Sequence, residues 1–199
     1  MSHQAAAPSI NQVLLEVYFD ADQNSSDLSH SLKRISANAP DPEPSSGQHA
    51  DSLYFAPGEQ LSLRVTGRGS IASDVRPENR FASFQVIDCV IITRPQAIQR
   101  GAGLPTKYAA PSPFQQAVGA CYPLALDFSA SIAGYPPQKQ RTVTQTWKRT
   151  LDVGGAPGLW ELSLVMTVRI ARGLGAIDEL RVLSFDPEAE VGGNGGLKE

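Results

Sequence analysis

The segment from Leu159 to Ile170 alternates apolar and polar residues with a period of two. The apolar residues occupy every even position: Trp160, Leu162, Leu164, Met166, Val168 and Ile170. This period places all of them on one face of a β-strand, whereas a helix would spread them around its axis. Because that long apolar face has to be buried, the segment predicts a second layer of structure packed against it.

Six other segments show similar alternation or short β-branched runs, and we predict strands there and in 159–170. The remaining six are 10–20, 58–66, 81–93, 124–132, 141–151 and 178–185. The segment 81–93 is apolar on both faces, which favours a central strand. Glycine and proline are abundant, with 17 and 15 residues, and favour many turns. These patterns predict an all-β fold: an antiparallel β-sandwich of about seven to eight strands with long loops and one or two short helices.

Two short helices are predicted by capping patterns. Asp27 can cap a helix that carries Leu28, Leu32 and Ile35 on one face. Ser112 followed by Pro113 predicts a second helical turn that ends near Val118. Segments 159–170 and 178–185 are expected to form a hairpin, because the glycine-rich turn 173–175 separates them.

The chain is expected to form one domain over residues 1–199, with flexible tails at about 1–9 and 192–199. No apolar run reaches the length of a transmembrane helix, and the first residues lack the pattern of a secretory signal. We therefore expect a cytoplasmic protein that has no membrane partner. Cys89 lies in an apolar strand pattern, and a bridge to Cys121 would require an oxidising compartment.

Charge is distributed unevenly along the chain. Residues 1–60 contain 2 basic and 8 acidic residues, residues 61–150 contain 11 and 4, and residues 151–199 contain 4 and 8. The acidic ends and the basic middle are expected to neutralise each other within the fold or between subunits. The central arginines Arg64, Arg68, Arg76, Arg80, Arg94 and Arg100 lack interleaved exposed aromatic residues, so nucleic-acid binding is not predicted.

The sequence contains no recognisable catalytic, cofactor or metal site. No Gly-x-Ser-x-Gly motif is present, and His3, His30 and His49 lie in segments predicted as tail or loop. Two acidic clusters follow strands and could in principle hold Ca²⁺: Asp20, Asp22 and Asp27 form one, and Asp186, Glu188 and Glu190 form the other. Neither cluster matches the known calcium-loop motif, so we expect solvated carboxylates at both places.

Aromatic residues provide the only candidates for ligand contacts. Trp160 begins the apolar face of 159–170, which predicts a core position. Trp147 lies on a threonine-rich strand, and Tyr122 follows the long loop. A carbohydrate or small-molecule site could therefore use Trp147 or Tyr122 as a platform, with the 95–121 loop as a lid.

Three short passages, taken in order, resemble a known family. They are Val13–Asp20, Leu53–Glu59 and Phe185–Glu188, which read VLLEVYFD, LYFAPGE and FDPE. In order and size they resemble the bacterial inclusion-body (PixA/AidA-like) proteins. This resemblance implies a cytoplasmic β-sandwich that self-associates and has no established enzymatic activity, and it carries no site residue across to this chain.

Two functions follow as hypotheses. The first is a non-enzymatic structural or interaction protein, a homo-oligomer that assembles through a sheet edge or sheet face. The alternative is a binding module for a glycan or another small molecule that uses the 95–121 loop.

Overall fold

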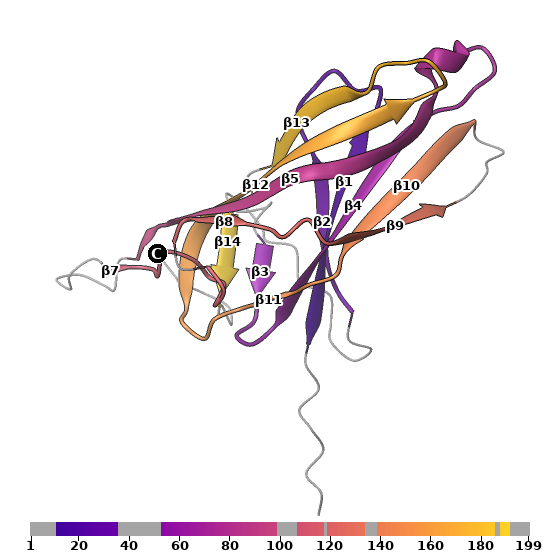
Figure 1. Cartoon of the computed structure of the whole chain (residues 1–199). Coiled ribbons are helices and arrows are strands. Elements are labelled where there is room, and N and C mark those ends of the chain that lie inside the picture. Colours follow the sequence, from indigo (N-terminus) through magenta and orange to yellow (C-terminus); the bar gives the residue numbers. More distant parts are fainter. Residues whose placement is uncertain are drawn as a thin grey trace, which may run out of the picture.

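The computed structural model shows two six-stranded β-sheets packed together, so the predicted all-β sandwich is confirmed (Figure 1). Described residues are 11–35, 53–98, 107–117, 119–133, 139–185 and 188–191. The predicted tails and part of the 95–121 loop lie outside them. Sheet A has the order β2-β1-β4-β10-β9, with β11 also paired to β4. Its strands are β1 Gln12–Asp20, β2 Ser29–Arg34, β4 Gln60–Ser70, β9 Phe128–Ala133, β10 Gln140–Trp147 and β11 Leu151–Asp152.

Sheet B has the order β3-β14-β12-β5-β8, with β13 paired to one side of β12. Its strands are β3 Leu53–Phe55, β5 Phe81–Pro95, β8 Cys121–Pro123, β12 Gly158–Arg172, β13 Glu179–Phe185 and β14 Glu188–Val191. A separate small sheet joins β6 Ala97–Ile98 to β7 Lys107–Tyr108. The short 3₁₀ helix η2, Pro77–Asn79, precedes β5. Sheet B is built around the antiparallel pair β5 and β12. Within the described residues β5 has a second neighbour, β8, only at Val90 to Ile92, so the central position predicted for 81–93 holds for that part of the strand alone.

Two strand pairs depart from the predicted antiparallel arrangement. β1 is parallel to β4, and β14 is parallel to β3. The chain leaves β2 and contributes β3 to sheet B before it returns to sheet A as β4. Because no tight hairpin connects β1 to β4, the chain can enter β4 in the direction parallel to β1.

Both predicted helices are wrong. The segment after Asp27 forms β2, which pairs with β1 along its length, and Leu28 is buried just before it. Backbone pairing to a neighbouring strand is more favourable there than nucleating a short helix. At the second site, the Ser112 side chain accepts a hydrogen bond from the Phe114 amide, and Phe114 bridges to Val153. Among the described residues, η2 is the only helical element.

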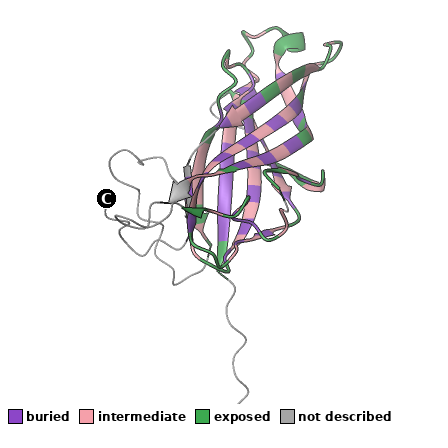
Figure 2. Ribbon diagram, turned by 90° about the vertical axis from the view of Figure 1, so that its left-hand side faces the viewer, coloured by how far each residue is buried: buried purple, intermediate pink, exposed green. Residues whose placement is uncertain are grey.

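The alternating residues of β12 form the centre of the core, as predicted. All six even-numbered apolar residues from position 160 to 170 are buried, and Figure 2 shows buried positions alternating along the strands. The sheets approach closely where β4 carries glycine. A Cβ at Gly69 would lie 2.4 Å from the Phe81 Cβ, and one at Gly67 would lie 2.8 Å from the Phe84 ring. These glycines allow the Phe84 and Phe81 side chains of sheet B to pack directly on the β4 backbone.

Ion pairs connect the acidic ends of the chain to its basic middle. Glu16 on β1 accepts hydrogen bonds from Arg64 on β4 and from Lys33 on β2. Arg94 on β5 pairs with Glu161 on β12. Part of the uneven charge is therefore neutralised within a single chain. Within the described ranges, no helix has the length and apolarity needed to cross a lipid bilayer.

Candidate interaction surface

Of the two residues proposed as alternative ligand platforms, Trp147 lies in the core. Trp147 is only 5% exposed, and its indole Nε1 donates a hydrogen bond to the Ala125 carbonyl oxygen at 2.8 Å. Its place in the core contradicts the proposed platform, because both its ring and its polar atom are already engaged. Tyr122 on β8 is partly buried against the same core. Residues 99–106 and 118 of the proposed lid lie outside the described residues.

The strand-end carboxylates do not form a metal site among the described residues, where no group of three or more metal-ligating side chains gathers. Asp22 is paired with Arg172. Asp186 and the side chains of Glu188 and Glu190 lie outside the described part of the chain. Cys89 and Cys121 are both free, and burial raises the pKa of the Cys89 thiol to about 12.

One exposed sheet edge is closed by side chains. In the described part of the chain, the first half of β5 has no strand beside it on the side away from β12, since β8 pairs only with Val90 to Ile92. Gln145 from β10 reaches across to this edge, where it donates to the Phe84 carbonyl oxygen and accepts from the Val86 amide. Arg141 donates to the Ala82 carbonyl oxygen at 3.0 Å. Side chains from sheet A thus satisfy backbone groups that would otherwise be open to another strand.

The edge of β13 is left open. Near its end, the Ser184 amide donates to the Ser26 carbonyl oxygen, and the Ser184 carbonyl accepts from the Leu28 amide. The backbone groups of Ser184 therefore point away from β12. Since the direction alternates along an antiparallel strand, those of Val182 and Leu180 point the same way. No strand in the described part of the chain pairs with β13 on that side.

Aliphatic side chains accompany this open edge. Leu180 and Val182 on β13 are 61% and 59% exposed on the outer face of sheet B. The turn between β12 and β13 adds Leu174 and Ile177, which are almost completely exposed. We define the open edge and these four residues as the β13 surface. A strand edge with unpaired backbone groups and exposed aliphatic residues is a template for pairing with another chain.

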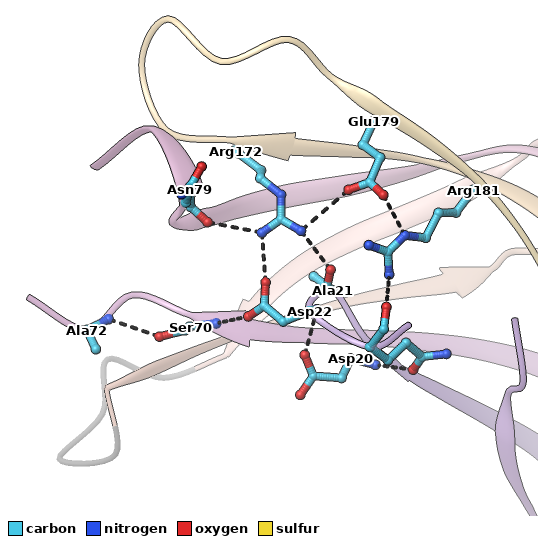
Figure 3. Close-up of polar contacts among 10 residues, drawn as sticks. Asp20, Ala21, Asp22, Ser70, Ala72, Asn79, Arg172, Glu179 and Arg181 are labelled. Atoms are coloured by element: carbon cyan, nitrogen blue, oxygen red, sulfur yellow. Dashed lines mark hydrogen bonds and ion pairs between the residues drawn. The ribbon is translucent and has the colours of Figure 1, made fainter. Parts of the chain in front are cut away.

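A charged network holds the inner side of β13 in place (Figure 3). Arg172, at the end of β12, lies between Asp22 and Glu179 and contacts carboxylate oxygens of both, at 2.8 and 3.4 Å. Its guanidinium also donates to the Ala21 and Asn79 carbonyl oxygens. Arg181 donates to Glu179 at 2.7 Å. These contacts hold the start of β13 in place from its inner face, so the strand is ordered along its open edge.

The network predicts sensitivity to acid. The hydrogen bond from Arg181 lowers the pKa of Glu179 despite partial burial. Burial opposes ionisation of Asp22, but hydrogen bonds from Arg172 and the Ser70 amide outweigh it and lower the pKa of Asp22. A carboxyl with a lowered pKa stabilises the fold above its ordinary pKa, and this contribution is lost as the pH falls through the folded-state value.

We therefore expect Arg172→Gln to lower the free energy of unfolding at neutral pH and to reduce its decline between about pH 5 and pH 3. Urea denaturation at several pH values measures both effects. Arg94→Gln is the matched control, because Arg94 forms an exposed ion pair on the same sheet. An acid-dependent loss in Arg172→Gln as steep as that of the unmodified protein would contradict this prediction.

A cavity of about 330 Å³ opens near the same end of the sandwich. Ile71, Pro77 and Phe81 give it apolar walls, and Arg80 and Arg141 give it two positive charges. Arg80 donates to the carbonyl oxygens of Val75 and Ser73. Neither arginine pairs with a carboxylate among the described residues. The cavity therefore combines an apolar body with uncompensated positive charge.

Comparison with known proteins adds no relative to this picture. No family model, no curated protein and no solved structure matches the chain.

Proposed function

We propose that this chain is a non-enzymatic structural protein that self-associates through the β13 surface. The observation that carries the proposal is the open edge of β13 beside the exposed side chains of Leu180 and Val182. Pairing this edge with another copy would satisfy its backbone groups and bury aliphatic surface, which stabilises association by about 25 cal/mol per Å² of apolar area. The likeness to bacterial inclusion-body proteins points in the same direction.

The contrast with β5 strengthens the proposal. Soluble proteins usually protect exposed strand edges with charged residues, bulges or covering segments. On β5 the Gln145 and Arg141 side chains fulfil that role. On β13 the backbone of Ser26 and Leu28 covers the edge only at Ser184. Toward the start of the strand, the exposed side chains of Leu180 and Val182 are aliphatic. An edge left open in this way fits an interface between copies.

Introducing charge at this edge is the direct test. We expect Leu180→Lys/Val182→Lys to be monomeric at concentrations where the unmodified protein associates, because lysine on an edge strand opposes pairing. Sedimentation velocity across a range of protein and salt concentrations measures the change. Ile132→Lys is the matched control, since Ile132 is a 66% exposed aliphatic residue on β9, an edge strand of sheet A.

Two results would contradict the proposal. One is an unmodified protein that stays monomeric at every ionic strength. The other is association of Leu180→Lys/Val182→Lys equal to that of the unmodified chain, with both showing the same far-ultraviolet circular dichroism spectrum.

We also propose a second candidate function, binding of a small organic anion, because the cavity places Arg80 and Arg141 beside apolar walls. Benzoate matches that chemistry, while benzyl alcohol has a similar shape without the charge. Isothermal titration should detect benzoate binding that weakens in Arg141→Gln and persists in Arg94→Gln. Equal responses to benzoate and benzyl alcohol, or no response to either, would exclude this function.

A further inference from the structure

The β13 edge is specific enough to define how two copies meet. We infer that β13 pairs antiparallel with β13 of a second copy, across a two-fold axis at Leu180. This inference rests on the proposed function and adds the symmetry and register of the interface. A two-fold axis makes the contact isologous, so that each copy uses the same residues and the assembly closes as a dimer.

Backbone geometry restricts the registers that are available. Only even-numbered residues of β13 direct their amide and carbonyl groups outward, because Ser184 does so and the direction alternates. In an antiparallel pair, residues that exchange both hydrogen bonds lie directly opposite each other. The symmetric registers that join outward residues in this half of the strand are therefore centred on Glu179, Leu180, Arg181 or Val182. A centre at Glu179 places the two copies of this carboxylate directly opposite each other, which is destabilising.

The segment before β2 excludes the register centred on Val182. That register places Leu180 of one copy opposite Ser184 of the other. The outward groups of Ser184 are already bonded to Ser26 and Leu28, whose backbone occupies the position beside it. A centre at Arg181 meets the same obstacle, because it brings Asp178, directly before β13, opposite Ser184. With the centre at Leu180, the residue opposite Ser184 is Ala176. Ala176 belongs to the turn before β13, where its amide bonds to the Gly173 carbonyl, so no strand has to pair with Ser184.

Charge on the inner face selects the same register. With the axis at Arg181, the two copies of this arginine face each other directly, and like charges opposite each other are destabilising. With the axis at Leu180, Glu179 of each copy faces Arg181 of the other. Both side chains already belong to the network in Figure 3, where they contact each other at 2.7 Å. The dimer would extend that network across the axis with opposite charges as neighbours.

Parallel pairing in register is disfavoured for a related reason. It would align Glu179 with Glu179 and Arg181 with Arg181 along the shared edge. The antiparallel register at Leu180 instead places the two Leu180 side chains side by side on the outer face. It also pairs Val182 with Asp178 of the other copy, so that Asp178, Leu180 and Val182 of each copy exchange backbone hydrogen bonds.

Disulfide crosslinking tests the register. Each variant carries Cys121→Ser to remove the exposed native thiol, and Cys89 is buried. Opposed residues in a hydrogen-bonded antiparallel pair have Cα atoms about 5.5 Å apart, within the range of a disulfide. Leu180→Cys should therefore give a crosslinked dimer on mild oxidation. Val182→Cys should lose that dimer, because its two copies would be about 13 Å apart along the strands.

A mixing experiment provides the internal control. Asp178→Cys and Val182→Cys should each fail to crosslink alone, whereas an equimolar mixture should form a heterodimer, since the register places these residues opposite each other. The association state of each variant is measured by sedimentation before oxidation. Crosslinking of Val182→Cys alone, or of Arg181→Cys in preference to Leu180→Cys, would overturn the register while leaving self-association intact. A protein that sediments as a monomer throughout would instead overturn the proposed function.

Discussion

Trp160→Ala is expected to lower the free energy of unfolding by about 3–5 kcal/mol, the usual cost of removing a large buried aromatic side chain. Trp160 is 1% exposed, and its indole Nε1 donates a hydrogen bond to the Ala110 carbonyl oxygen at 2.7 Å. The ring also packs against Gly158, where a Cβ would lie only 2.6 Å from it. The substitution therefore creates a cavity and leaves the Ala110 carbonyl without its partner.

Urea denaturation followed by circular dichroism measures this loss. Tyr108→Ala is the control, because Tyr108 is an exposed aromatic residue near the same loop. Its substitution should change the free energy of unfolding by no more than about 0.5 kcal/mol. A loss below about 1 kcal/mol for Trp160→Ala would show that sheet B does not depend on this side chain for its packing.

Glu59→Gln is expected to have the second largest effect, a loss of about 2–3 kcal/mol, because it weakens a buried charged network. The Glu59 carboxylate is almost completely buried, and its two oxygens accept from Arg34 Nε and from the Ala56 amide, both at 2.7 Å. These bonds join the end of β2 to the turn that leads into β4. A neutral amide leaves the Arg34 guanidinium without its counter-charge and turns one acceptor into a donor.

Glu161→Gln is the matched control for this prediction. Glu161 also pairs with an arginine, Arg94, but both side chains are exposed, and exposed ion pairs contribute about 0–1 kcal/mol. Chemical denaturation of the two variants under identical conditions separates the contributions. Equal losses in Glu59→Gln and Glu161→Gln would contradict the assigned role of burial.

The sequence predicts the long strands because their patterns are strong. The even-numbered apolar residues of β12 indicated a strand with one buried face, and they form the centre of the core. The segment 81–93 was expected to be central and pairs with β12. Short strands such as β7 and β8 were missed, since two or three residues are too few to reveal a period of two.

The errors come from features that depend on tertiary structure. Leu28, Leu32 and Ile35 have helical spacing, yet pairing with β1 makes this segment the strand β2. The parallel pairing of β1 with β4 depends on the path of the chain through sheet B, which no local pattern records. Trp147 was considered as a ligand contact because it lies on a threonine-rich strand, although its side chain is buried in the core.

The β13 surface left one signal in the sequence. Leu180 and Val182 alternate with Glu179 and Arg181, so the first half of the strand has a charged face and an aliphatic face. When the pairing register with β12 is unknown, this pattern predicts that the aliphatic face of β13 is buried. The pairing with β12 shows the opposite, because Val182 lies beside Thr167 and Leu180 beside Arg169 on the outer face.

Amide hydrogen exchange at Leu180 and Val182, measured as a function of protein concentration, tests the central claim most directly. In the monomer these two amides point to solvent and should exchange rapidly, while the Leu183 amide, directed toward β12, should be protected. If copies pair through β13, protection of Leu180 and Val182 rises with concentration in step with association. Association that proceeds while these two amides keep their rapid exchange would contradict the claim.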